Sequence, residues 1–159
     1  AGMTHETHLR AAGLVILIGL LGLSSDLRWA WQNSPFDRGA GWIFAAWIGL
    51  AGWTGGRTAR PVAAGLVVGL GLGLVSVVGE LNVARHAALA VLVGAWMPGW
   101  FTRIVILMSG VAWWPALGWG VTQFMDGPFV IWVRATLLIA AGLTLWRRRP
   151  EPPNPEVTL

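Results

Sequence analysis

The segment GELNVARHAAL (79–89) concentrates the side chains of this sequence that are best suited to chemistry: Glu80, Asn82, Arg85 and His86. A histidine beside a carboxylate can act as a general acid or base, and an arginine can hold an anionic group. The same residue types also form hydrogen bonds and ion pairs that only hold the helices of a membrane protein together. A catalytic or binding site and a structural network therefore both remain open.

Four arginines on one side of the predicted fold each have an acidic residue near them in the sequence. The potential pairs are Asp26 with Arg28, Asp37 with Arg38, Glu80 with Arg85, and Asp126 with Arg134. An arginine at mid-bilayer costs about 2.5–3.5 kcal/mol on insertion scales, so pairing and shallow placement would be favourable. We predict a charge-neutral network that opens to the outer face, with candidate ligand- or partner-binding residues Asp26, Arg28, Glu80, Asn82, Arg85, His86, Asp126 and Arg134.

His86 has three interpretations. It could be a hydrogen-bonded histidine between helices, an acid–base catalyst, or the ligand of a pigment or haem. Haem held by two histidines within the chain is excluded, because the other histidines lie in the N-terminal segment. No metal site and no cofactor are predicted, since few candidate ligands cluster with suitable spacing.

Absent residue types exclude further chemistry. The chain has no cysteine and no lysine, which excludes thiolate nucleophiles, disulfides and a Schiff base to retinal. No ionisable residue falls near the middle of a predicted helix, which disfavours an ion pump or secondary transporter. All positive charge comes from arginine, which in such an apolar chain sets topology and lipid contact; nucleic acid is not an expected partner.

The elements that must position these residues are apolar helices. Of 159 residues, 55% are hydrophobic and 11% charged, and the mean hydropathy is +0.63. This predicts an all-α, polytopic integral membrane protein. The six predicted transmembrane helices of the bundle span roughly 10–31, 39–55, 61–79, 82–98, 101–120 and 128–146. Residues 1–149 would form one domain, and the proline-rich segment 150–159 a disordered tail.

Arginine placement predicts the orientation. Seven arginines fall at one set of helix ends, namely Arg10, Arg57, Arg60, Arg103 and Arg147 to Arg149. Four fall at the other ends, namely Arg28, Arg38, Arg85 and Arg134. By the positive-inside rule both termini are cytoplasmic, in a multi-pass protein of the bacterial inner membrane.

Glycine and tryptophan positions predict packing and anchoring. Gly65, Gly69 and Gly73 recur every four residues, which predicts a helix face for close packing inside the bundle or in an oligomer. Most of the twelve tryptophans gather near predicted helix ends, which is typical of interfacial girdles. The alternative is a tryptophan-lined pocket for a lipid, quinone or pigment, with WWPALGW (113–119) as its wall.

The stretch DLRWAWQNSPFDRGAGWIFAAWIGLAGW followed by GGRTARP resembles the opening of the exosortase and archaeosortase family of membrane proteins. GLVVGLGLGLVSVVGELNVARHAALAVLVGAW and FTRIVILMSGVAWWPALGW resemble that family's next helices, so the resemblance covers about residues 15–119. It implies a membrane transpeptidase ancestry with a cysteine nucleophile assisted by arginine and histidine. This chain has no cysteine, so the resemblance implies a truncated, non-catalytic relative and assigns no catalytic role to Arg134 or His86.

The leading hypothesis is a non-catalytic accessory or assembly subunit that binds a membrane partner or lipid through the outer network. Expected partners are membrane lipids and a membrane protein or a second copy of the chain. One rival is an enzyme acting on a lipid-linked or peptide substrate at the extracytoplasmic face. There Glu80 and His86 would do acid–base work while Arg85 and Arg134 held an anion. A second rival is a pigment- or quinone-binding subunit.

Overall fold

The computed structural model describes the backbone of residues 2–55 and 61–148 and the side chains from residue 7 onward within those ranges. This part of the chain is all-helical and contains no strand, so the predicted helical class is confirmed. Its α-helices are α1 (Gly2–Leu23), α2 (Ser25–Asn33), α3 (Ala40–Gly55), α4 (Ala63–Val78), α5 (Asn82–Ala95), α6 (Trp100–Gly110), α7 (Pro115–Val121) and α8 (Val130–Arg147). The short 3-10 helices η1 (Val111–Trp113) and η2 (Gly127–Phe129) precede α7 and α8. The predicted tail, 150–159, lies outside the described residues.

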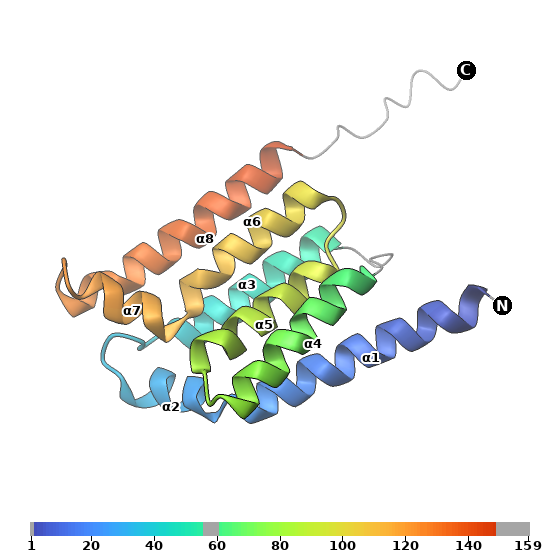
Figure 1. Ribbon diagram of the computed structural model, residues 1–159. Helices are drawn as coiled ribbons and strands as arrows, with labels where there is room; N and C mark the ends of the chain where they lie inside the picture. The colour runs from blue at the N-terminus through green and yellow to red at the C-terminus, as the bar shows by residue number, and fades with distance from the viewer. Residues whose placement is uncertain (1, 56–60, 149–159) are drawn as a thin grey trace, which may run out of the picture.

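The long helices α1, α3, α4, α5, α6 and α8 lie side by side, and successive ones run in opposite directions (Figure 1). The short helices α2 and α7 lie at the same end of this bundle as the turn between α4 and α5 (Figure 1). The start of α1 and the end of α8 lie at the other end. The antiparallel order therefore brings α2, α7 and the α4–α5 turn together, although they are far apart in the sequence.

Two predicted helices, 10–31 and 101–120, are wrong as single helices, because each is broken. The chain bends by 49° between α1 and α2 at Ser24, and by 67° between η1 and α7 at Trp114. Trp114 precedes Pro115 and has extended backbone angles, φ −71° and ψ 136°. A proline ring disfavours helical angles in the residue before it, so the second break follows from Pro115. At the first break, the Ser24 hydroxyl donates to the Leu20 carbonyl oxygen at 2.7 Å.

The structure supports fewer membrane-spanning helices than the six that the sequence predicts. Within the described ranges, only the helix Gly127–Arg147 is long and apolar enough to cross a membrane on its own. Two further spans result if each bent pair, α1 with α2 and α6 with α7, is one crossing. α4 has 16 residues and α5 has 14. At about 1.5 Å per residue they are about 24 and 21 Å long, against a hydrocarbon core of about 30 Å. The six-span count therefore stays a prediction.

The core is built around α5. Most residues of its second half are buried, and the fully buried indole rings of Trp47 and Trp113 complete the centre. The Trp47 indole N–H donates to the Ile106 carbonyl oxygen at 3.0 Å, which ties α3 to α6. This leaves the centre of the bundle filled with side chains.

The predicted glycine face of α4 packs inside the bundle. A Cβ atom on Gly65 would lie 2.7 Å from the Ala95 Cβ, and one on Gly69 would lie 2.6 Å from the Leu92 Cγ. On Gly73 it would lie 3.1 Å from the Leu20 side chain. Because these positions of α4 have no side chain, α5 and α1 can approach its backbone closely. This close packing sets the position of the α4–α5 turn relative to α1.

Candidate functional site

Asp26 is the centre of a first group of charges. It lies in the first turn of α2, directly after the break at Ser24. The His86 Nε2 lies 2.9 Å from one carboxylate oxygen of Asp26, and the Arg85 Nη1 lies 3.5 Å from the other. Arg85 also donates to the carbonyl oxygen of Leu23 at 2.7 Å. The beginning of α5 is therefore held to the α1–α2 bend by one carboxylate and one freed helix carbonyl.

Arg134 is the centre of a second group. Its side chain is fully buried, and its Nη2 donates to the Asp37 Oδ1 at 2.5 Å. Its Nη1 donates to the carbonyl oxygens of Ala112 and Trp114, at 2.6 and 3.1 Å. The helix break at Trp114 makes carbonyls accessible to a guanidinium from α8, and the Trp114 carbonyl also accepts from the Leu117 N–H at 3.1 Å. One arginine therefore joins α8, η1 and the loop between α2 and α3.

Gly118 makes room for this ion pair. A Cβ atom built on Gly118 would lie 2.6 Å from the Arg134 Nη2 and 2.7 Å from the Asp37 Oδ1. Both distances are shorter than real Cβ contacts. The α7 backbone can therefore cover the pair only because residue 118 has no side chain.

Aromatic rings connect the two groups. The His86 ring lies 5.9 Å from the Trp113 ring and 6.3 Å from the Trp114 ring, measured between centroids. Trp113 in turn packs edge-on against Phe44 at 5.0 Å. The Trp114 ring thus lies beside His86 while its carbonyl oxygen accepts from Arg134, which links the two groups. We refer to Asp26, Asp37, Arg85, His86 and Arg134 as the polar network.

Burial in the loop between α2 and α3 affects the pKa of Asp37. Burial raises the pKa of the Asp37 carboxyl above its ordinary value, whereas a hydrogen bond from Ser34 and the charge of Arg134 act in the opposite direction. The Arg134 guanidinium therefore offsets part of the cost of burying this carboxylate.

Several N–H groups around the network are buried without an acceptor among the described residues. They belong to the indoles of Trp31, Trp113 and Trp114 and to the Nε of Arg85 and Arg134. A buried donor without a partner typically costs about 1–3 kcal/mol. An acceptor placed beside these donors would therefore be favourable.

The structure brings together four of the predicted site residues and separates the others. Asp26, Arg85, His86 and Arg134 belong to the network. Arg28, Glu80, Asn82 and Asp126 have exposed side chains and join no ion pair among the described residues. Glu80 occupies the tight turn between α4 and α5, with a positive φ of 54°. Its carboxylate therefore lies outside the network.

The predicted pairings by sequence proximity are wrong. Arg85 pairs with Asp26 rather than Glu80, and Arg134 pairs with Asp37 rather than Asp126. Asp26 and Asp37 do not pair with Arg28 or Arg38. Neighbours in sequence lie on one helix end, whereas these partners face each other across the bundle. Asp37 was not among the predicted site residues, and no local motif distinguishes it from the other acidic residues.

The tryptophans predicted for one girdle separate into two sets. Trp29, Trp42, Trp119 and Trp132 are more than 60% exposed, as an interfacial girdle requires. Trp31, Trp113 and Trp114 face inward, where Trp113 and Trp114 form the wall beside His86. Of the predicted WWPALGW wall, Trp113 and Trp114 are therefore packed inside while Trp119 is exposed, and none of the described pockets is lined by this stretch.

The charged groups of the polar network are paired with one another. The His86 ring is 2% exposed and one of its nitrogens is already bound to Asp26. Within the described side chains, no group of three histidine or acidic residues is placed to hold a metal ion. The pairs that these side chains form neutralise their buried charges.

In comparisons with known proteins, no protein-family model, no curated protein and no solved structure matches this chain.

Proposed function

We propose that this chain is a multi-pass membrane protein without enzyme activity, an accessory or assembly subunit of the bacterial inner membrane. It binds a membrane-protein partner, a second copy of itself or lipid at the end of the bundle that holds the polar network. The observation that carries the proposal is the internal pairing of Arg134 with Asp37, and of Arg85 and His86 with Asp26. Groups paired in this way stabilise a fold, whereas a catalytic acid or base has to reach a substrate.

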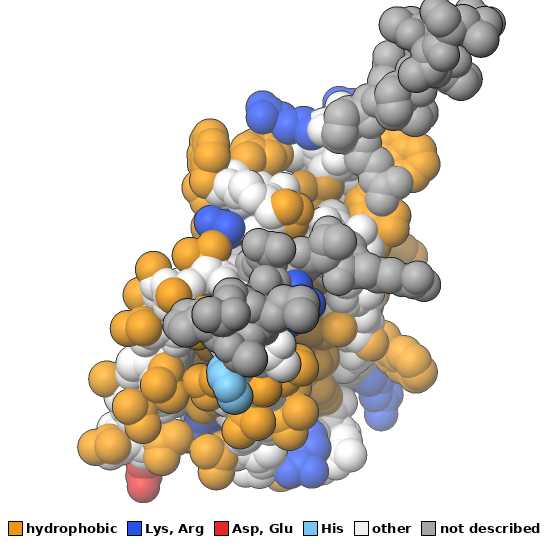
Figure 2. All heavy atoms as spheres, turned by 90° about the vertical axis from the view of Figure 1, so that its right-hand side faces the viewer, with side chains coloured by type: hydrophobic (Ala, Val, Ile, Leu, Met, Phe, Trp, Pro, Cys, Tyr) orange, Lys and Arg blue, Asp and Glu red, His pale blue; other side chains and the backbone are white. Residues whose placement is uncertain are grey.

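The outer surface of the bundle supports membrane insertion. Large apolar side chains on α1, α4 and α8 are more than half exposed, among them Val15, Ile18, Val67, Leu74, Ile139 and Leu143. Figure 2 shows hydrophobic side chains over much of one face. Exposed apolar surface of this extent marks contact with lipid or with another protein. The exposed helix surfaces are therefore suited to a bilayer.

The network end offers a surface for a partner. Exposed aromatic side chains gather on the elements around it, namely Trp29, Trp42, Trp119, Phe124, Phe129 and Trp132. Aromatic rings supply large contact areas with little loss of side-chain entropy. The network beneath would hold α2, α7 and α8 in place, so that these rings keep a fixed arrangement. The exosortase resemblance stays a prediction, and the proposal does not depend on it.

The enzyme hypothesis requires Glu80 and His86 in one pocket. Glu80 is exposed in the α4–α5 turn, whereas His86 is buried and bound to Asp26. The pigment hypothesis requires a free ring nitrogen of His86 that faces a cavity. An absorption spectrum of protein purified from native membranes tests it directly, because a bound pigment or quinone would add absorption beyond that of tryptophan.

Single-cysteine labelling tests the topology, and the chain suits it because it has no cysteine. Gln123→Cys lies at the network end, and Pro98→Cys lies in the α5–α6 loop at the other end; both positions are exposed. A membrane-impermeant maleimide added to intact spheroplasts should label Gln123→Cys only. Pro98→Cys should react after permeabilisation. Extraction of the chain by alkaline carbonate, or labelling of both positions from one side, would refute the proposal.

A photo-crosslinking amino acid tests partner binding at the network end. Placed at position 119 it should form an adduct with one defined protein or lipid in native membranes. The matched position is Trp100, which is similarly exposed at the opposite end (71% against 68%) and should not form the same adduct. Identical adducts from both positions would argue against a specific surface at the network.

A further inference from the structure

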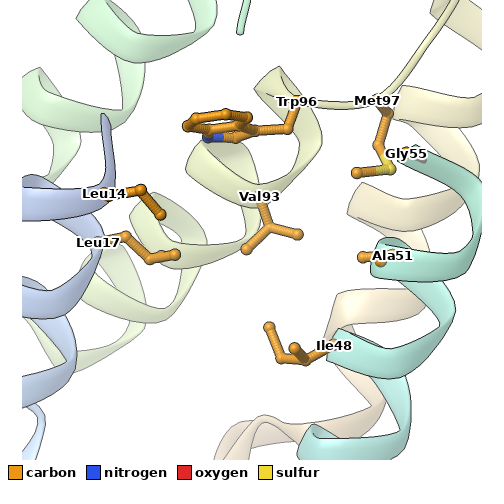
Figure 3. A pocket seen from close by; sticks show the side chains of 9 residues that line it. Leu14, Leu17, Ile48, Ala51, Gly55, Val93, Trp96 and Met97 are labelled. Carbon is orange, nitrogen blue, oxygen red and sulfur yellow. The ribbon is translucent and has the colours of Figure 1, made fainter. Parts of the chain in front are cut away.

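An apolar groove lies between α1 and α3, far from the polar network. Its walls are Leu14 and Leu17 on α1 and Ile48 and Ala51 on α3. Val93 on α5 forms its floor, and Figure 3 shows these side chains around the open space. Gly52, Gly55, Trp96 and Met97 complete the lining, and the volume is about 240 Å³. The groove lies between two packing partners, because α1 packs against α4 and α5 whereas α3 packs against α6 and α8.

One end of the groove is amphipathic. The Trp96 indole lies there, and its ring packs on α1 at Gly13, where a Cβ would be 3.1 Å from the Trp96 Cζ2. Figure 3 places Trp96 and Met97 at the same end of the groove, with Ile48 at the opposite end. A tryptophan in this position is typical of the boundary between hydrocarbon and headgroups.

The same end of the molecule is basic. Arg10 precedes Leu14 by four residues and Leu17 by seven, so helix geometry places it on the face of α1 that lines the groove, one turn closer to the end. Arg103, Arg147 and Arg148 lie at this end of α6 and α8. Among the side chains that the structure describes, those of the acidic residues Asp26, Asp37, Glu80 and Asp126 belong to the opposite end. Figure 2 shows basic side chains on this face among hydrophobic ones.

We propose that the groove binds an acyl chain of an anionic phospholipid, whose headgroup lies beside Trp96 and Arg10. The lining is hydrocarbon, and the charge at its open end is opposite to that of the lipid. A partner helix fits less well, because a helix with its side chains is a rigid rod about 10 Å across. A flexible acyl chain can follow a narrow apolar space. The inference rests on the membrane insertion proposed above.

Two glycines on α3 provide a matched pair of variants. A Cβ at Gly52, which lines the groove, or at Gly49, which does not, would meet no atom within 4 Å. Gly52→Leu therefore adds a side chain at the groove, and Gly49→Leu adds the same side chain to α3 away from the groove lining. For the headgroup, Arg10→Gln is compared with Arg28→Gln, because Arg28 is exposed at the opposite end.

The experiment titrates the detergent-solubilised chain with dioleoyl phosphatidylglycerol or dioleoyl phosphatidylcholine and measures bound lipid by native mass spectrometry. The wild type should bind phosphatidylglycerol more tightly. Gly52→Leu should weaken that binding about tenfold, the change expected when about two methylene groups are kept out of the groove. Gly49→Leu should not change it. Arg10→Gln should remove the preference between the two lipids, and Arg28→Gln should leave it intact.

Equal affinities of the wild type for the two lipids, or equal effects of Gly52→Leu and Gly49→Leu, would overturn the inference. Loss of a crosslinked partner protein in Gly52→Leu, with lipid binding unchanged, would also overturn it and assign the groove to a helix. Carbonate extraction of the wild-type chain is a separate measurement. The chain can stay in the membrane pellet while the lipid test fails, so failure of this inference is distinguishable from failure of the proposed function.

Discussion

The guanidinium of Arg134 and the carboxylate of Asp37 form a buried ion pair across 97 positions of sequence. Gly118 covers the pair, and the carbonyl oxygens of Ala112 and Trp114 take the second guanidinium nitrogen. Removing one partner of such a pair leaves an uncompensated charge, whereas removing both can be nearly neutral. This asymmetry distinguishes a structural pair from two independent surface charges.

The first prediction concerns this pair. Asp37→Asn or Arg134→Met should each reduce the free energy of unfolding by about 3–5 kcal/mol. The double variant should lose less than the sum of the two single effects. Reversible unfolding in detergent micelles, followed by circular dichroism, measures all three. Strictly additive losses would show that the two side chains do not interact.

The second prediction concerns Gly118. Gly118→Ala should destabilise the protein by about 1–3 kcal/mol, because its methyl group would overlap both partners of the ion pair. Gly120→Ala is the control, since a Cβ there meets nothing within 4 Å on the same short helix. The melting temperature of each variant in the same detergent provides the comparison. Similar melting temperatures for the two variants would contradict the placement of Gly118.

The third prediction compares two acidic residues. Asp26→Asn should lower the melting temperature, because it weakens the contacts of both His86 and Arg85. Glu80→Gln should leave it unchanged, since the Glu80 side chain is exposed in its turn. If Glu80→Gln proved the more harmful change, Glu80 rather than Asp26 would be the partner of the α5 charges.

The fourth prediction concerns the glycine face of α4. Gly69→Ala should destabilise the bundle, because its Cβ would lie 2.6 Å from the Leu92 side chain. Gly71→Ala should be neutral or slightly stabilising, since no atom lies within 4 Å and alanine favours the helix by up to about 1 kcal/mol. The melting temperatures of the two variants show whether each of these glycines lies on the packed or on the open face of α4. Equal effects would contradict the close approach of α4 and α5.

The positions of most helices could be predicted from apolar runs, because a hydrophobic segment satisfies its backbone hydrogen bonds by forming a helix. The break at Trp114 could also have been predicted, since Pro115 disfavours a helical conformation of the residue before it. The break at Ser24 has a weaker local signal. Serine in an apolar helix can donate to the carbonyl four residues earlier, as Ser24 does, without ending the helix.

The partners of the charges could not be predicted from local sequence. Arg134 is much closer in sequence to Asp126, but its side chain meets Asp37 because α8 packs against α3 and the loop before it. Glu80 lies in the α4–α5 turn with a positive φ, and its side chain is exposed there, while Arg85 pairs with Asp26. The existence of a neutral cluster followed from composition, whereas the choice of partners depended on helix packing.

The position of Arg134 on α8 also affects the order in which the protein is completed during synthesis. Asp37 leaves the ribosome 97 residues before Arg134, and the acceptor carbonyls of Ala112 and Trp114 precede Arg134 by 22 and 20 residues. Until α8 arrives, the nascent chain holds an acidic group and a helix break that lack their shared cation. Synthesis of α8 is therefore the step that completes the Arg134 contacts of the polar network.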